Sequence, residues 1–141
     1  MNGYLLDTNC ISEAVRAQPE PRVMSWLEAV DEALLYLSVL TLGEIRKGVA
    51  SLPQSRRRTL LESWLNSELR ARFSSRILPV DLAIADRWGL LSATAKNEGR
   101  ALSTIDGLLA ATAIQHSLTI VSRNDGDFAG MPIQVFNPWK S

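Results

Sequence analysis

Hydrophobic residues in this chain form short continuous runs, separated by longer stretches in which apolar positions recur with helical spacing. The runs occupy residues 4–6, 33–38, 76–80, 118–121 and 133–136. Apolar runs of this length, bounded by polar or turn-forming residues, are typical of strands buried on both faces. The pattern therefore predicts five strands, the last of them short.

The stretches between the runs predict helices, and several begin with a capping signal. We expect helices over residues 12–16, 21–30, 41–50, 56–72, from 81 to about 99, and 106–116. Pro21 suits a first helical turn, Asp81 suits an N-cap, and Ser103 or Thr104 can cap the last helix. Thr41 and Glu44 match a capping box, which would place Glu44 in a first turn.

Strands that alternate with helices predict an α/β fold in which a mostly parallel sheet is covered on both faces. This arrangement is a three-layer α/β/α sandwich. The 141 residues are 46% hydrophobic, which is enough for one domain over residues 1–141 with a substantial core.

Charge and cysteine content narrow the classes of partner and compartment. Lys and Arg number 15, as do Asp and Glu, so no global basic field predicts nucleic-acid binding and any RNA contact must be local. The single Cys10 cannot form an intramolecular disulfide, and charged residues interrupt every apolar stretch before it reaches about 20 residues. The N-terminal residues lack the apolar run of a signal peptide. We expect a cytoplasmic protein.

Four acidic residues fall where the predicted fold brings ligands. Ligands of parallel sheets bind beyond the carboxyl ends of the strands. Asp7 follows the first strand, Asp127 lies in the loop after the fourth, and Glu44 and Asp106 lie in the first turns of predicted helices. We expect these four segments to converge, although each acid alone also has a structural explanation as a cap, a turn residue or a helix-dipole partner.

Converging carboxylates repel one another, and a divalent cation relieves that repulsion. Oxygen donors favour Mg²⁺ or Mn²⁺ over Zn²⁺, which prefers the His and Cys side chains that occur here once each. Asp7 and Asp106 are the first choices as metal ligands. Glu44 would orient a water or complete a second metal site, and Asp127 would support the outer shell. Such a site suits hydrolysis of a phosphodiester.

Four ordered motifs give the chain a family resemblance. These are Leu5-Leu6-Asp7-Thr8-Asn9 with Ile11-Ser12-Glu13, then Leu42 to Gly48, then Ile105 to Ala113, and then Ser122-Arg123-Asn124 with Asp127-Phe128. Together they resemble a PIN domain along essentially the whole chain. The ending Phe136-Asn137-Pro138-Trp139 resembles the FitB-like branch of VapC toxins.

The resemblance implies a metal-dependent ribonuclease toxin of a bacterial toxin–antitoxin pair, dimeric and silenced by a small DNA-binding antitoxin. It carries metal ligation to Asp7 and Asp106, and the acidic pocket to Glu44. The fourth position stays open, because Asn124 stands where some relatives carry Asp, so that Asp125 or Asp127 would have to compensate.

Two other functions compete with this interpretation. An aspartyl-phosphate hydrolase of the haloacid-dehalogenase type also has an Asp after its first strand, but it needs a second Asp two residues later, where this chain has Asn9. A PIN-like interaction module without activity would keep the fold and lose the metal. The set of Asp7, Glu44 and Asp106 favours an active endoribonuclease.

Several other residues have a structural and a functional interpretation. Arg56, Arg57 and Arg58, with Arg70, Arg72 and Arg76, would attract RNA or form a solvated face. Arg46 and Lys47, which lie near Glu44, would contact phosphate, or Arg46 would pair with a local acid. Thr8 would hydrogen-bond a site carboxylate, whereas Asn9 would cap the next helix. We expect Trp26, Trp64, Trp88 and Cys10 to be packing residues, and His116 to be a cation at the C-terminal end of a helix.

Overall fold

The structure, a computed structural model, describes residues 3–140 and contains a five-stranded sheet in the order β3-β2-β1-β4-β5. The strands are β1 (Tyr4–Leu6), β2 (Leu35–Ser38), β3 (Ile77–Leu78), β4 (Thr119–Val121) and β5 (Val135–Phe136). All four pairings are parallel, so every strand points its carboxyl end toward the same edge. The predicted parallel sheet is confirmed.

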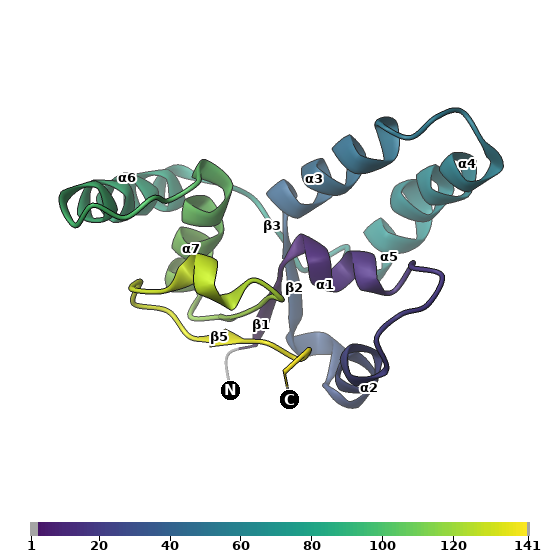
Figure 1. The fold of residues 1–141 in the computed structure, drawn as a ribbon, viewed down its shortest axis with the longest axis horizontal. Coiled ribbons are helices and arrows are strands. Elements are labelled where there is room, and N and C mark those ends of the chain that lie inside the picture. The colour runs from purple at the N-terminus through teal and green to yellow at the C-terminus, as the bar shows by residue number, and fades with distance from the viewer. Residues whose placement is uncertain (1–2, 141) are drawn as a thin grey trace.

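Helical segments connect the strands and lie on both sides of the sheet (Figure 1). They are α1 (Thr8–Glu13), α2 (Pro21–Ala29), η1 (Glu32–Leu34), α3 (Val39–Ala50), α4 (Arg56–Ser63), η2 (Trp64–Leu69), α5 (Arg70–Arg72), α6 (Leu82–Asn97), α7 (Thr104–His116) and η3 (Asp125–Phe128). Within residues 3–140, no helix is both long enough and apolar enough to cross a membrane.

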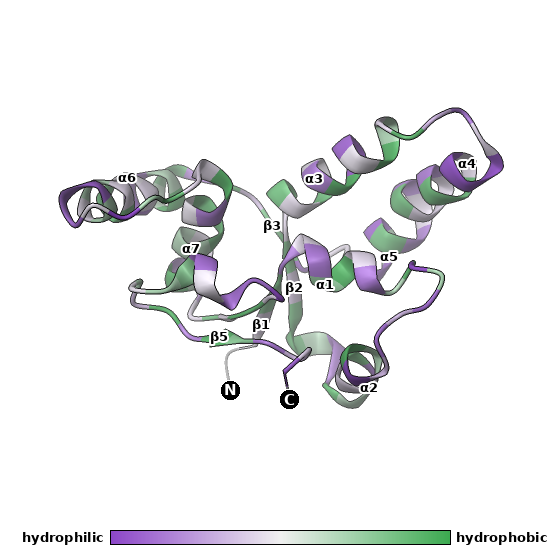
Figure 2. Ribbon diagram, in the orientation of Figure 1, coloured by the Kyte–Doolittle hydropathy of each residue, from purple (hydrophilic) through white to green (hydrophobic). Residues whose placement is uncertain are grey.

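Alternate residues of each strand supply two separate cores. In β1, Leu6 packs with α1, α2, α3 and the α4–α5 segment, whereas Leu5 packs with α7 on the opposite face. In β4, Val121 and Ile120 divide in the same way, because successive strand side chains point to opposite faces. Figure 2 shows the strands and inward helix faces as hydrophobic and much of α4 as hydrophilic. The three-layer α/β/α sandwich is therefore confirmed.

Two predicted helix starts were wrong. The first helix begins at Thr8 and not at Ser12, because Asp7 itself caps it. The third begins at Val39, because the Ser38 hydroxyl accepts a hydrogen bond from the Leu40 amide at 3.0 Å. The capping box at Thr41 therefore does not form, and Glu44 lies in the second turn of α3. The predicted helix over 56–72 is continuous but contains a π-helical turn at η2.

Candidate functional site

Asp7 lies at the carboxyl end of the central strand and is buried, with 9% of its surface exposed. Its Oδ1 accepts a hydrogen bond from the Thr8 amide at 2.8 Å, which caps α1. The Asp7 amide donates to the Val121 carbonyl at 2.9 Å and extends the β1–β4 ladder by one step. The strand and the helix that begins after it therefore fix both the position and the direction of this carboxylate.

Ser122 holds the other oxygen of Asp7. Leu6 pairs with Val121 in the sheet, so the residues that follow them, Asp7 and Ser122, lie side by side at the strand ends. The Ser122 hydroxyl is fully buried and donates to Asp7 Oδ2 at 2.8 Å. It also accepts from the Asn124 amide at 3.0 Å. Sequence analysis gave Ser122 no role, because its contact with Asp7 depends on strand register.

Glu44 reaches the site from α3 and is joined to α1 by Thr8. The Thr8 hydroxyl donates to Glu44 Oε1 at 2.5 Å, so Thr8 contributes its amide to one site carboxylate and its hydroxyl to another. Hydrogen bonding of a site carboxylate by Thr8 is confirmed. The prediction that Asn9 caps a helix was wrong, because Asn9 lies within α1 and accepts from the Arg123 amide at 3.2 Å.

Asp106 lies in the first turn of α7, as predicted, and Ser103 is the N-cap. The Ser103 hydroxyl accepts a hydrogen bond from the Asp106 amide at 3.1 Å. Gly107 follows and packs directly against Trp88 of α6, since a Cβ built on Gly107 would lie 2.8 Å from Trp88 Cδ1. The α6–α7 contact therefore places the start of α7, and Asp106 with it, at this edge of the sheet.

Electrostatics connects the four predicted acids. Burial raises the pKa of the Asp7 carboxyl; the hydrogen bonds from Ser122 and Thr8 oppose this shift, and the carboxylates of Glu44 and Asp127 add to it. Burial also raises the pKa of Asp106, against a hydrogen bond with Ser103, with Asp127 and Asp7 contributing further. Asp7 thus interacts with the other three acids, and negative charge is concentrated at the carboxyl ends of β1 and β4.

The three candidates for the fourth position differ in their surroundings. Lys140 Nζ lies 3.2 Å from Asp125 Oδ2, and its hydrogen bond lowers the pKa of the Asp125 carboxyl. Asn137 also approaches Asp125, with its Nδ2 3.4 Å from Oδ1. Asp127 in η3 instead acts on Asp7 and Asp106. Asn124 precedes η3 and forms no side-chain cap there. These contacts favour Asp127 over Asp125 and Asn124 as the fourth acidic residue of the site.

The donor set suits a hard divalent cation that keeps part of its water shell. In residues 3–140, no group of three or more His, Cys, Asp or Glu side chains is placed to hold a metal ion, so the protein would supply fewer than three of the ligands. Mg²⁺ characteristically takes one or two protein carboxylates and completes its shell with water and phosphate oxygens. Asp7 and Asp106 fit this requirement, because each has a raised pKa that a nearby cation would lower.

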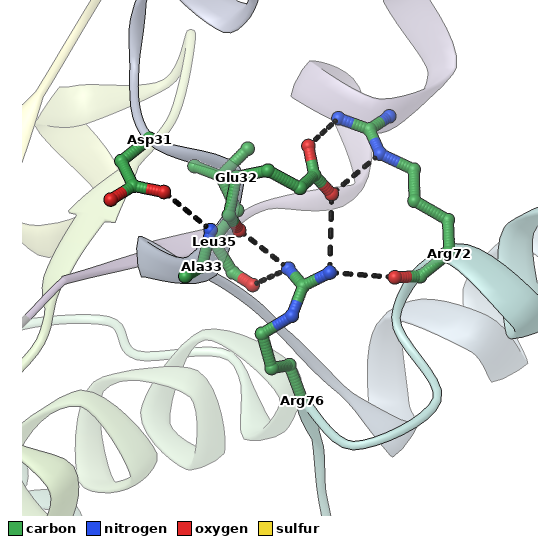
Figure 3. A network of polar contacts seen from close by, with 6 residues as sticks. All are labelled: Asp31, Glu32, Ala33, Leu35, Arg72 and Arg76. Carbon is green, nitrogen blue, oxygen red and sulfur yellow. Dashed lines mark hydrogen bonds and ion pairs between the residues drawn. The ribbon is translucent and has the colours of Figure 1, made fainter.

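The arginines divide between structural and exposed positions. Arg72 and Arg76 both bind the Glu32 carboxylate, and Arg76 also donates to the carbonyls of Glu32, Leu35 and Arg72 (Figure 3). These two arginines therefore join β2 to the segment before β3. Arg72 is exposed, as a solvated face predicts, although it is paired with Glu32, whereas Arg76 is largely buried and the solvated-face prediction was wrong for it.

The basic residues of the α3–α4 region divide in the same way between internal contacts and exposed positions. Arg58 donates to the Leu52 carbonyl at 3.0 Å and pairs with Glu62. Arg46 donates to the Asn66 side chain of η2, which is an amide and not the local acid that was expected as an alternative partner. Arg56 and Arg57 are exposed and line a groove between α1 and α4.

The aromatic residues and Cys10 behave as packing residues. Trp26 contacts the rings of Tyr4 and Phe136, and Trp64 packs on the same core. Cys10 is buried, and burial raises the pKa of its thiol to about 12, which keeps it protonated and unreactive at neutral pH. His116 occupies the last turn of α7, as predicted.

Comparisons with known proteins agree with this fold along the whole chain. The PIN domain model matches residues 4–133. Toxin FitB of Neisseria gonorrhoeae is 42% identical over 135 residues, covering 96% of this chain and 97% of that protein. VapC ribonuclease Y4jK of Sinorhizobium fredii is 36% identical over 136 residues, covering 96% of this chain and 97% of that protein.

Solved structures of related toxins superpose closely on this chain. The crystal structure of FitAcB from Neisseria gonorrhoeae contains a chain that superposes with a TM-score of 0.93 at 40% identity, covering 98% of this chain and 99% of that one. A structure of FitAB bound to an IR36 DNA fragment gives a TM-score of 0.91 at 40% identity, covering 96% of this chain and 95% of that one. The chain therefore belongs to the PIN domain family, in the group that contains FitB and the VapC proteins.

Proposed function

We propose that this chain is a metal-dependent endoribonuclease and the toxin of a type II toxin–antitoxin pair. The observation that carries the proposal is Asp7, a buried carboxylate at the end of the central strand that interacts with three other acids. Its position costs the metal-free fold stability, because buried like charges repel one another. A site that binds a cation and a phosphate explains why the charge is retained.

We propose that Asp7 and Asp106 ligate Mg²⁺ or Mn²⁺ directly, with Glu44 as the group that orients the attacking water or as a ligand of a second metal. Asp127 completes the negative site from η3. A bound cation would polarise the phosphate and lower the pKa of a coordinated water. Thr8 donates to Glu44 and Ser122 donates to Asp7, and these hydrogen bonds restrain the orientation of both carboxylates.

The partners we propose are an RNA substrate, a small DNA-binding antitoxin and a second copy of the chain. A groove between α1, α3 and α4 supports the antitoxin. Val15, Leu61 and Trp64 line it, Arg16 and Arg57 flank it, and it extends to Thr8 and Glu44. A protein segment seated there would reach the acids and block them. We also propose that the protein acts in the cytoplasm, where an RNA-cutting toxin meets its substrates.

Surface substitutions test the two protein partners separately. Leu60 is 60% exposed and lines the same groove. Leu60→Glu should weaken inhibition by the antitoxin and leave cleavage by the free toxin unchanged. On α6, Leu82 and Leu90 are 86% and 63% exposed, which supports a self-association surface. Leu82→Glu with Leu90→Glu should reduce the mass measured in solution if this surface joins two copies.

Cleavage of a mixed cellular RNA pool by the purified protein tests the activity itself. We expect cuts with Mg²⁺ or Mn²⁺ and none with EDTA, with Asp7→Asn or with Asp106→Asn. Glu28→Gln is the matched control, because Glu28 is an exposed acid on α2, outside the proposed site and partner surfaces, and its substitution should leave cleavage intact. Folded wild-type protein that makes no cuts with either metal would instead indicate a PIN-like module without activity.

A further inference from the structure

A second cavity opens beside the acidic site, on the side of α6 and α7. Its volume is about 450 Å³, within the range of about 300–1,000 Å³ that small-molecule sites occupy. Asp106 and Asp127 line it together with Arg100, which comes from the loop between α6 and α7. The cavity therefore combines acids suited to a metal-bound phosphate with a cation.

Arg100 is held in place by the protein and still has donors to offer. Its Nε and Nη2 donate to Glu98 Oε1 at 2.9 and 2.6 Å, and its Nη1 donates to the Ala129 carbonyl at 3.3 Å. These bonds use three of the five N–H groups of a guanidinium. In the described part of the chain, one hydrogen on each Nη atom is left for a ligand, and 29% of the side chain is exposed.

The backbone around Arg100 adds to this fixed geometry. Gly130 adopts a φ of +82°, which favours glycine, and a Cβ built there would lie 3.2 Å from Arg100 Cζ. Gly130 thus lets the loop after η3 lie against the guanidinium. Gly130 therefore allows close contact between the segment that follows η3 and the loop that carries Arg100, and both segments line the cavity.

The remaining walls suit the uncharged part of a nucleotide. Leu102 contributes an apolar surface, and Ala129 and Gly126 add little bulk. A Cβ built on Gly126 would have no heavy atom within 4 Å, so the space above this residue is open. A cavity that combines two acids, one cation and an apolar surface suits a sugar and base that link two phosphates.

We propose that this cavity binds the nucleotide next to the bond that is cut, with Arg100 contacting the phosphate on its far side. The proposal rests on the proposed ribonuclease function, since it places the phosphate under attack at Asp7 and Asp106. Along one RNA strand the next phosphate follows after one sugar, so a cation is needed at the other end of the cavity. Arg100 supplies that charge, and its planar fork matches phosphate oxygens.

A protein segment fits this cavity less well than RNA does. The groove of Val15, Leu61 and Trp64 offers a larger apolar surface to a peptide. The cavity beside Arg100 instead exposes two carboxylates, which would repel an acidic peptide and which RNA can approach through a bound cation. We therefore assign the cavity to RNA, and the experiments below distinguish RNA binding from peptide binding.

Arg100→Ala tests the cationic end, with Arg22→Ala as the matched control. Arg22 also donates its Nε to a glutamate two residues earlier, Glu20, but it lies on α2, away from α6 and α7 (Figure 1). Both variants lose the same charge. We expect Arg100→Ala to raise KM for RNA about tenfold with kcat unchanged, and the slope of log(kcat/KM) against log salt to become shallower by about 0.7. Arg22→Ala should change neither.

Filling the cavity provides a second test that keeps the cation. Gly126→Leu should project a side chain into open space and raise KM for RNA without lowering Tm, because no protein atom lies near its Cβ position. Gly89→Leu on α6 is the control, since a Cβ there also has no heavy atom within 4 Å and Gly89 does not line the cavity. Arg100→Lys should preserve the salt slope, because it keeps the charge.

Direct binding separates failure of this subsite from failure of the ribonuclease assignment. A short fluorescein-labelled single-stranded RNA is titrated with Asp7→Asn protein in Mg²⁺, with and without Arg100→Ala. A rise of about tenfold in Kd supports the subsite even if wild-type protein cuts no RNA, an outcome that would refute only the nuclease. Equal Kd values, or a loss of antitoxin binding in Arg100→Ala with RNA binding unchanged, would overturn the subsite.

Discussion

Removal of the single Ser122 hydroxyl should lower both the stability of the fold and the activity of the site at acidic pH. In Ser122→Ala, Asp7 Oδ2 loses a buried donor at 2.8 Å and the Asn124 amide loses an acceptor at 3.0 Å. A hydrogen bond to a charged group contributes about 2 kcal/mol and a neutral one about 1 kcal/mol. The free energy of unfolding should therefore fall by about 3 kcal/mol, which lowers Tm by about 10 °C in a domain of this size.

The same substitution should change how activity depends on pH. The Ser122 hydroxyl donates to the ionised carboxylate, so it lowers the pKa of Asp7 against the effect of burial. Its removal raises that pKa further. Asp7 must lose its proton before it can ligate a cation, so the acid limb of the pH–rate profile should move to higher pH in Ser122→Ala.

Urea denaturation and pH–rate profiles measure these two effects on the same protein. Ser51→Ala is the control, because Ser51 is exposed and its hydroxyl donates only to the Lys47 carbonyl, which water can reach. Its unfolding free energy should change by less than about 0.5 kcal/mol. If Ser122→Ala matched Ser51→Ala in stability and kept the wild-type acid limb, the assignment of Ser122 as the residue that orients Asp7 would be refuted.

Three further predictions concern the metal, the arginine network and the start of α7. Folding raises the pKa of Asp7 and Asp106, so the stability of the metal-free protein should fall as pH rises from about 3.8 through their folded pKa values. Calorimetry at neutral pH should show that Mg²⁺ at about ten times its Kd raises Tm by about 4 °C. An unchanged Tm would count against cation binding at these acids. Arg76→Ala should lower the free energy of unfolding by about 3 kcal/mol in urea denaturation, because three carbonyls lose their donor. Glu32→Gln removes only the charge of the ion pair and should lower it by less than about 1 kcal/mol. Equal losses would contradict the conclusion that the carbonyl contacts contribute more than the ion pair. Gly107→Ala should cost about 2 kcal/mol and reduce cleavage, because its methyl group meets the indole packed on α7; wild-type values of both would exclude this packing constraint.

Local patterns were sufficient to predict the sheet and the positions of two of the acids. Asp7 follows an apolar run, and Asp106 follows a serine cap, so both could be placed by residues within a few positions of them in the sequence. Glu44 was placed one turn too early, because Ser38 and Thr41 are both good N-caps and sequence gives little basis for choosing between them. Strand β2 ends directly before α3, and this selects Ser38.

The contacts between distant segments could not be predicted in the same way. Asp125 and Asp127 lie in one loop, and the difference between them comes from Lys140, which reaches Asp125 from the end of the chain. Ser122 meets Asp7 only because β1 and β4 are neighbours in register. The presence of Arg100 and Asp106 in one cavity likewise depends on the packing of α6 and α7. Each of these three contacts can be predicted only when the order and packing of the strands and helices are known.

The distribution of charge implies that metal and RNA bind to this protein with positive coupling. The chain has equal numbers of acidic and basic residues, so no overall positive field offsets the acids at the strand ends. RNA phosphate that approaches these carboxylates without a cation meets like charge at short range. A bound divalent ion reverses the sign of the local field, and by linkage RNA then tightens the binding of the ion by the same factor. Arg100 acts at the far end of the adjacent cavity and cannot replace that ion, so it should set how tightly a strand is held while the acids decide whether it is cut.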